Sequence, residues 1–248
     1  MSGRVALVTG AGRGIGRATA LLLASRGARV MATSRSESDL ATLGLEYVAA
    51  DMGDPDGCAA AVAETERRLG PIEILVVNHG IGSAHERLIW EQDPAVWRET
   101  MRINLDGPFE LSRLVVGGMV ERGYGRVAYT SSTAGQVAER AGSAYTASKH
   151  GLLGLMRSVA QDAGPFGVTS NAVLPGWVRT SMAERSAAEE ARQREITVDE
   201  VWAERSAMYG PGRVVTPEEV AETLTFLCSD EASGVNGEAV TVALGSIW

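Results

Sequence analysis

The chain is poor in the residues that mark several specialised classes of protein. Only two of its 248 residues are cysteines and three are histidines, and aromatic side chains make up 5%. The two cysteines, Cys58 and Cys228, have no CxxC partner and no histidine at ligand spacing. We therefore expect two buried free thiols, and neither a disulfide nor a metal site.

Long apolar runs and an excess of positive charge are also absent. No apolar stretch reaches the roughly 18 residues that a membrane span needs, and no basic-then-apolar leader precedes the first strand pattern. The formal net charge of −8 argues against nucleic acid or an anionic membrane as the main partner. The sequence thus predicts a cytoplasmic protein with no nucleic-acid partner and no membrane partner.

What the chain has is a regular alternation of short apolar segments and helical patterns, with no internal repeat and no linker. This alternation predicts one α/β domain over residues 1–248, a doubly wound, Rossmann-like parallel sheet of about seven strands. Residues up to about 100 and residues from about 101 to 248 form the two halves of this domain. Residues 181–213, rich in Ala, Glu and Arg, are interpreted as one or two lid helices over the substrate, and no arginine there is assigned a function.

A glycine-rich turn, TGAGRGIG, joins the first predicted strand at 4–9 to a helical pattern at 15–26. Glycines let the backbone approach a pyrophosphate, and the following helix N-terminus supplies free N–H groups and a positive dipole. The turn departs from the strict GxGxxG fingerprint. We expect a dinucleotide to bind at this turn, whose residues include Thr9, Gly10, Gly14, Ile15 and Gly16.

The second predicted strand, 29–33, is followed by Ser34 and Arg35. Rossmann enzymes that use NAD place a carboxylate about 20 residues after the glycine turn, whereas a 2′-phosphate calls for arginine. Here the acid is missing, and a second arginine, Arg13, lies inside the turn. These residues predict NADP(H) as cofactor; the alternative is that both arginines face solvent.

Tyr145 and Lys149 lie four residues apart on a predicted helix, 143–163, and so project from the same face. A nearby cation favours the phenolate form of tyrosine, so such a phenol exchanges protons nearer neutrality than its usual pKa of about 10 allows. Ser132 follows a predicted strand and is a candidate to hydrogen-bond the same substrate oxygen. The three side chains together suit proton transfer to a carbonyl or from an alcohol.

The motifs TGxxxGxG and Ser-x12-Tyr-x3-Lys resemble those of the classical short-chain dehydrogenases/reductases, over practically the whole chain. Within that family, the sequence most resembles 3-oxoacyl-(acyl-carrier-protein) reductases and polyketide ketoreductases. The resemblance implies a nucleotide-binding half at about 1–100 and a catalytic half at about 101–248, with a catalytic set of Asn104, Ser132, Tyr145 and Lys149. It further implies cofactor contacts from Arg13, Asp51, Met52, Asn78, Gly80, Pro175, Gly176, Val178 and Thr180, with Tyr145 and Lys149 also at the cofactor.

One of these positions, Asn104, has two competing interpretations, and His79 and the end of the chain depart from the family. Asn104, in a helical stretch at 94–122 that we expect to kink near Gly107, matches the residue that holds a relay water in the family; the alternative is a satisfied polar side chain. His79 stands where the family has alanine, and we interpret it as a loop residue that fills space. The end of the chain also departs from the family, with Ala243-Leu244-Gly245 in place of Asp-Gly-Gly.

The resemblance implies NADPH-dependent reduction of a ketone, with Tyr145 as general acid. The substrate would be a small carbonyl or alcohol, including a carrier-bound acyl chain, and the assembly a homotetramer. Alternatives are an NAD(P)-dependent dehydrogenase of a small secondary alcohol or hydroxy acid, an epimerase or dehydratase using the same tyrosine, and a non-catalytic NADP-binding regulatory or scaffold protein. Trp177, Trp202 and Trp90 suggest a partly aromatic pocket, although core packing explains them equally well.

Overall fold

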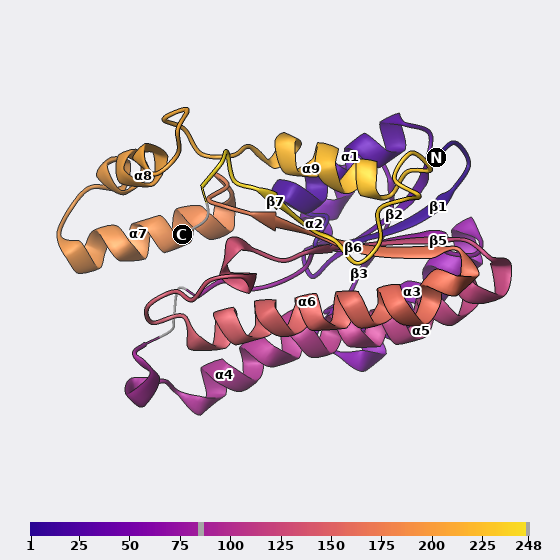
Figure 1. Cartoon of the computed structure of the whole chain (residues 1–248), viewed down its shortest axis with the longest axis horizontal. Helices are drawn as coiled ribbons and strands as arrows, with labels where there is room; N and C mark the ends of the chain where they lie inside the picture. Colours follow the sequence, from indigo (N-terminus) through magenta and orange to yellow (C-terminus); the bar gives the residue numbers. More distant parts are fainter. Residues whose placement is uncertain (84–86, 247–248) are drawn as a thin grey trace.

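The chain folds around one parallel β-sheet, described here from a computed structural model that covers residues 1–83 and 87–246 (Figure 1). Within these residues the sheet has seven strands in the order β3-β2-β1-β4-β5-β6-β7. The predicted doubly wound sheet is thereby confirmed. Residues 84–86 of the loop after Asn78, and residues 247 and 248 of the unusual chain end, lie outside the described part.

The strands are β1 (Val5–Thr9), β2 (Arg29–Ser34), β3 (Glu46–Ala49), β4 (Ile74–Val77), β5 (Gly125–Thr130), β6 (Val168–Pro175) and β7 (Ala239–Val242). The α-helices are α1 (Gly14–Ser25), α2 (Glu37–Ala41), α3 (Pro55–Leu69), α4 (Pro94–Met101), α5 (Gly107–Arg122), α6 (Ser143–Ala163), α7 (Ser181–Arg194), α8 (Val198–Ala207) and α9 (Pro217–Leu227). Short 3-10 turns are η1 (Ile89–Glu91), η3 (Thr133–Gly135) and η4 (Gly164–Phe166), and η2 (Arg102–Asp106) is a π-helical turn.

The inner strands are apolar on both faces because helices cover both sides of the sheet. In β1, Val5 and Leu7 belong to one core cluster, whereas Ala6 and Val8 belong to another on the opposite face. Helices α1 and α9 pack on the second face, and α3, α5 and α6 lie on the first (Figure 1). The continuous apolar runs that predicted the strands are therefore explained by two-sided burial.

Helix boundaries follow the capping signals in the sequence. Asp54 caps α3 through its side chain, Pro55 is the first helical residue, and Gly70 at φ 95° ends the helix. Thr216 and Glu219 form a reciprocal capping box at the start of α9. The predicted helix at 143–163 matches α6 at both ends.

The long helical stretch at 94–122 is interrupted next to Gly107, where we expect a kink. The break is the π-helical turn η2, which ends at Asp106, directly before the first residue of α5. A Cβ on Gly107 would lie 2.0 Å from the Met52 carbonyl oxygen. Gly107 is therefore required for close packing against the loop that follows β3, and the neighbouring π-helical turn contains Asn104.

The carboxyl ends of the strands form one edge of the sheet, and chain order reverses there between β1 and β4. Open α/β sheets bind ligands in the crevice at such a switch point. Helices α7 and α8 extend beyond this edge, away from the rest of the molecule (Figure 1). Within the described residues, no helix has the length and apolar character required to cross a bilayer.

The two cysteines are free thiols inside the protein, as predicted. Burial raises the pKa of both thiols to about 12, so they remain protonated and unreactive at neutral pH.

Candidate active site

A cavity of about 520 Å³ runs along the carboxyl edge of the sheet. Its volume lies in the range typical of small-molecule and cofactor sites. The predicted site residues that line it are Gly10, Arg13, Gly14, Ile15, Ser34, Arg35, Asp51, Met52, Asn78, Gly80, Ser132, Tyr145, Lys149, Pro175, Gly176, Val178 and Thr180. Thr9, Gly16 and Asn104 do not line it; each contacts residues that do.

The glycine turn brings the start of α1 against the end of β1. Gly10 and Gly14 have φ of 64° and 50°, in the left-handed region that glycine adopts without strain. A Cβ on Gly16 would lie 2.2 Å from the Gly10 carbonyl oxygen and 2.5 Å from Asn78 Nδ2. Gly16 therefore acts through close packing beneath the turn rather than by facing the cavity.

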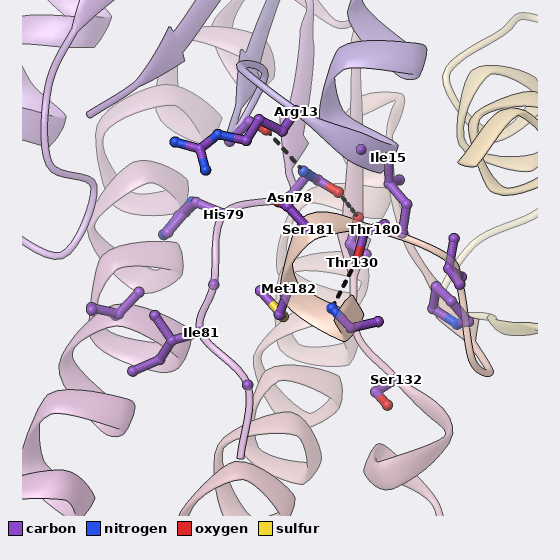
Figure 2. A pocket seen from close by; sticks show the side chains of 18 of the residues that line it. Arg13, Ile15, Asn78, His79, Ile81, Thr130, Ser132, Thr180, Ser181 and Met182 are labelled. Atoms are coloured by element: carbon purple, nitrogen blue, oxygen red, sulfur yellow. Dashed lines mark hydrogen bonds between the residues drawn. The ribbon is translucent and has the colours of Figure 1, made fainter. Parts of the chain in front are cut away.

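Thr9 and Asn78 tie three strand ends together. The buried Thr9 hydroxyl accepts hydrogen bonds from the backbone N–H groups of Asn78 (3.0 Å) and His79 (3.3 Å). Asn78 Nδ2 donates to the Gly10 carbonyl (3.4 Å), and Thr130 Oγ1 donates to Asn78 Oδ1 (3.0 Å). Figure 2 shows Asn78 between the glycine turn and Thr130. The ends of β1, β4 and β5 are thus held in register beside the cavity.

The two candidate phosphate-binding arginines have different surroundings. Both line the cavity, and both are largely exposed. Arg13 Nε lies 2.6 Å from Asp39 Oδ2 in an ion pair with α2. Arg35 makes no ion pair with the residues described here. Asp39, which the sequence analysis did not select, is therefore a third charged group at this end of the cavity.

Asp51 follows β3 and faces the same end. Partial burial alone would raise its pKa, but the Gly53 backbone N–H, 3.0 Å from Oδ1, and the Arg102 guanidinium, 3.3 Å from Oδ2, hold that pKa below its usual range. The carboxylate is therefore ionised at neutral pH. One carboxylate oxygen contacts Arg102, and the predicted contact of Asp51 with the cofactor stays a prediction.

Tyr145, Lys149 and Ser132 all line this cavity. Lys149 is 5% exposed; its Nζ donates to the Thr130 carbonyl (3.0 Å) and lies 5.6 Å from the centroid of the Tyr145 ring. Burial lowers the pKa of Lys149 to about 8. Ser132 Oγ accepts from the Ala134 N–H (3.1 Å), which fixes the side chain two residues beyond β5 (Figure 2). The structure thus brings together three of the four predicted catalytic side chains.

Asn104 lies behind this group, almost fully buried in the π-helical turn. Its Oδ1 accepts from the Ile81 N–H (2.8 Å), and its Nδ2 donates to the Ile81 carbonyl (3.0 Å) and to Ser148 Oγ (3.1 Å). A Cβ on Gly80 would lie 3.1 Å from Asn104 Oδ1 and 3.6 Å from Lys149 Nζ. Asn104 and Lys149 therefore approach the same glycine, and the interpretation as a satisfied polar residue and the relay role are both compatible with this geometry.

His79 lines the cavity and does more than fill space. Its Nδ1 is 2.8 Å from Thr9 Oγ1, so the imidazole joins the contacts that hold the ends of β1 and β4. Burial, assisted by the charge of Lys149, lowers the pKa of His79 to about 3. The ring is neutral at physiological pH, and no catalytic role follows from its position.

The lid, residues 181–213, contains two helices, α7 and α8, held by a buried arginine that sequence reasoning missed. The Arg205 guanidinium carbon lies 3.6 Å from the centroid of Trp177 and 5.1 Å from that of Trp202. Its Nη2 pairs with Glu190 at 2.9 Å. Trp177 lines the cavity, Trp202 is buried behind it, and Trp90 is 76% exposed away from it, so the aromatic prediction holds only for Trp177.

Comparisons with known proteins agree with this geometry. The sequence model of the enoyl-(acyl carrier protein) reductase family matches residues 10–246. The chain belongs to the short-chain dehydrogenase/reductase family. It is 37% identical, over 98% of this chain and 96% of the relative, to a ketoacyl reductase of the monensin polyketide synthase from Streptomyces virginiae. It is 35% identical, over the same shares, to a 3-oxoacyl-(acyl-carrier-protein) reductase of Vibrio cholerae.

Solved structures of the same family have the same fold. Levodione reductase superposes with a TM-score of 0.94 at 31% identity, covering 99% of this chain and 98% of that one. An actinorhodin polyketide ketoreductase variant with NADPH superposes with a TM-score of 0.91 at 32% identity, covering 98% and 97%. The short-chain dehydrogenase/reductase fold predicted from the motifs is therefore confirmed along the chain.

Proposed function

We propose that this protein is an NADPH-dependent reductase that converts a ketone, of the 3-oxoacyl or polyketide type, to an alcohol. The observation that carries the proposal is the placement of Tyr145, Lys149 and Ser132 in the same cavity as the glycine turn. The ketoacyl and 3-oxoacyl reductase names of the relatives, and the NADPH of the actinorhodin ketoreductase structure, support the reaction and the cofactor.

The residues present fit a dinucleotide phosphate. Gly10, Gly12 and Gly14 present backbone to the cavity, and Gly14 lies so close to Thr180 that an added Cβ would be 3.0 Å from Thr180 Cγ2. Arg13 and Arg35 supply positive charge beyond the turn, where a 2′-phosphate would be held with Ser34. When bound, the reduced nicotinamide supplies the hydride.

The chain's own side chains handle the substrate oxygen and its proton. Ser132 donates a hydrogen bond to the carbonyl oxygen and polarises it, and Tyr145 transfers its phenolic proton to that oxygen. The neighbouring Lys149 ammonium favours the resulting phenolate. Asn104 holds Ile81 and Ser148, and Ser148 Oγ donates to the Tyr145 carbonyl (2.8 Å), so this network orients the catalytic helix.

Replacement of the phenol tests the mechanism. Tyr145→Phe removes only the hydroxyl, and we expect turnover to fall by about 10²–10⁴, the usual worth of positioned proton transfer. Tyr47→Phe, the same chemical change on β3 outside the cavity, serves as the matched control and should retain wild-type turnover. The assay follows absorbance of the reduced nicotinamide; turnover by Tyr145→Phe within a fewfold of wild type would refute the role.

A substrate panel separates the alternatives. Acetoacetyl thioesters, levodione, and small secondary alcohols are assayed with NADPH and NADH. Oxidation of NADPH by the thioesters supports the proposal. Reduction of NAD by a small alcohol would favour the dehydrogenase. Product formation without a net change in cofactor would favour an epimerase or dehydratase. Stoichiometric binding of NADPH without turnover would favour a scaffold protein.

We further propose a homotetramer with a carrier-bound acyl chain among its substrates. Exposed aromatic side chains on α4 (Trp97, 38%) and α5 (Phe109, 49%) support an interface through these helices. Light scattering of the purified protein, read against the mass of 26.1 kDa per chain, tests the assembly. The cytoplasmic location stays a prediction.

A further inference from the structure

The end of the cavity beyond the glycine turn carries charges of both signs. Arg13, Arg35 and Asp39 all line it. Of the two arginines, only Arg13 is paired there, through the 2.6 Å contact of its Nε with Asp39 Oδ2. An acid is therefore placed against one of the two cations that would hold a 2′-phosphate.

Asp39 is held in this position by its backbone and its neighbours. Ser36 caps α2 by accepting from the Asp39 N–H (3.4 Å). A Cβ on Gly12 would lie 2.9 Å from Ser34 Oγ and 3.1 Å from Asp39 Cβ. The glycine turn, the end of β2 and the start of α2 are thus in direct contact, and Asp39 faces the turn.

The Asp39 carboxylate is ionised at neutral pH. The hydrogen bonds from Arg13 and Ser36 hold its pKa below the usual range, while its slight desolvation opposes them. The other acid at this end, Asp51, is already engaged by Arg102 and by the Gly53 N–H. Asp39 is therefore the carboxylate positioned to compete with a phosphate for Arg13.

We propose that Asp39 is a specificity-determining residue that weakens NADP(H) binding by holding Arg13 in an ion pair. The inference rests on the proposed use of NADPH. NADP(H) differs from NAD(H) by the 2′-phosphate, so only the phosphorylated cofactor has to take Arg13 from Asp39. The chain thereby binds NADPH less tightly, relative to NADH, than its two arginines alone would allow.

Direct cofactor titration of Asp39→Asn tests this role. The amide keeps the size of the side chain and the backbone cap but removes the charge. Without substrate, we expect the Kd for NADPH, followed by its fluorescence, to fall about tenfold, the scale of the charge-assisted hydrogen bond that Arg13 no longer has to give up before it binds the phosphate. The Kd for NADH should stay within about twofold. Equal tightening for both cofactors, or no tightening for NADPH, would overturn the proposal.

Two further variants make the test specific. Glu37→Gln removes the same charge from the same helix at a residue that does not line the cavity, and should leave both Kd values within about twofold of wild type. In an Arg13→Ala background, Asp39→Asn should tighten NADPH by less than about threefold, because the contested cation is gone. A full tenfold gain in that background, or with Glu37→Gln, would contradict the competition for Arg13.

The outcome for the proposed cofactor can be read separately. If neither the wild type nor Asp39→Asn binds NADPH, the proposed use of NADPH is wrong. If the wild type binds NADPH and Asp39→Asn binds it no more tightly, only the role of Asp39 is wrong.

Discussion

The glycine turn and the lid border the same cavity, but different kinds of contact hold them in place. At the turn, backbone meets backbone, and Gly16 has no room for even one added carbon. At the lid, long side chains make the contacts, with Arg205 stacked on Trp177 and paired with Glu190. The turn therefore tolerates almost no change, whereas the lid depends on a few side chains that can be replaced singly.

The largest expected effect comes from adding one carbon at the turn. Gly16→Ala places a Cβ 2.2 Å from the Gly10 carbonyl oxygen, so we expect a loss of about 3 kcal/mol or more in the free energy of unfolding. Binding of NADPH should weaken by at least about tenfold as the turn shifts. Chemical denaturation and fluorescence titration measure the two effects.

Gly154→Ala is the matched control on α6, where an added Cβ meets nothing within 4 Å. Helical propensity predicts stabilisation by about 0.4–1 kcal/mol. If the two alanine variants were equally stable, the account of the turn as a backbone contact would be wrong.

The second effect is the pH dependence of the free energy of unfolding that Lys149 contributes. Lys149 lies on α6, outside the lid. Its pKa is about 8 in the folded protein and about 10.4 in an unfolded chain. Between about pH 8 and 10.4 the unfolded state binds more protons, so the free energy of unfolding contributed by this group rises with pH. Below about pH 8 the buried ammonium carries its full desolvation cost.

The expected size is about 3 kcal/mol across that window, taken as the stability of the wild type minus that of Lys149→Met. Urea unfolding at several pH values measures the difference. Parallel pH curves for the two proteins would show that burial does not lower the Lys149 pKa.

The lid side of the comparison is tested by Arg205→Met. The change removes a buried cation from between two indole rings, and we expect a loss of about 2 kcal/mol, reduced from the value for fully buried pairs because Glu190 is partly exposed. The KM for the ketone should rise, while the Kd for NADPH stays within about twofold. Arg192→Met, at an exposed lid arginine paired with Glu189, should change neither quantity.

The smallest effects come from two matching helix caps. Thr197 and Thr216 each form a capping box, at the starts of α8 and α9. Either Thr→Ala change should cost about 1 kcal/mol locally. Because α9 packs on α1 against the sheet, Thr216→Ala should lower the global melting temperature. Thr197→Ala, in the lid, should mainly raise the substrate KM. If Thr197→Ala lowered the melting temperature and Thr216→Ala did not, the lid would unfold together with the sheet and its helices.

Sequence reasoning succeeded where a pattern is local. The two-sided burial of the strands, the caps of α3 and α9, and the shared face of Tyr145 and Lys149 all follow from spacings within one element. It failed where the partner is distant along the chain. Asp39 lies 26 residues from Arg13, and Arg205 contacts a tryptophan before the lid, so no spacing marks either one. Asn104 in the π-helical turn likewise hydrogen-bonds Ile81, which lies 23 residues earlier in the chain.

The lid also has a small apolar core of its own. Ala183, Ala187, Ala191, Val201 and Trp202 form a cluster separate from the two that flank the sheet. Substitutions inside this cluster can therefore change how α7 packs on α8 without touching the two clusters that hold the sheet and its helices. This part of the chain can thus be redesigned as a unit while the packing of the glycine turn stays unchanged.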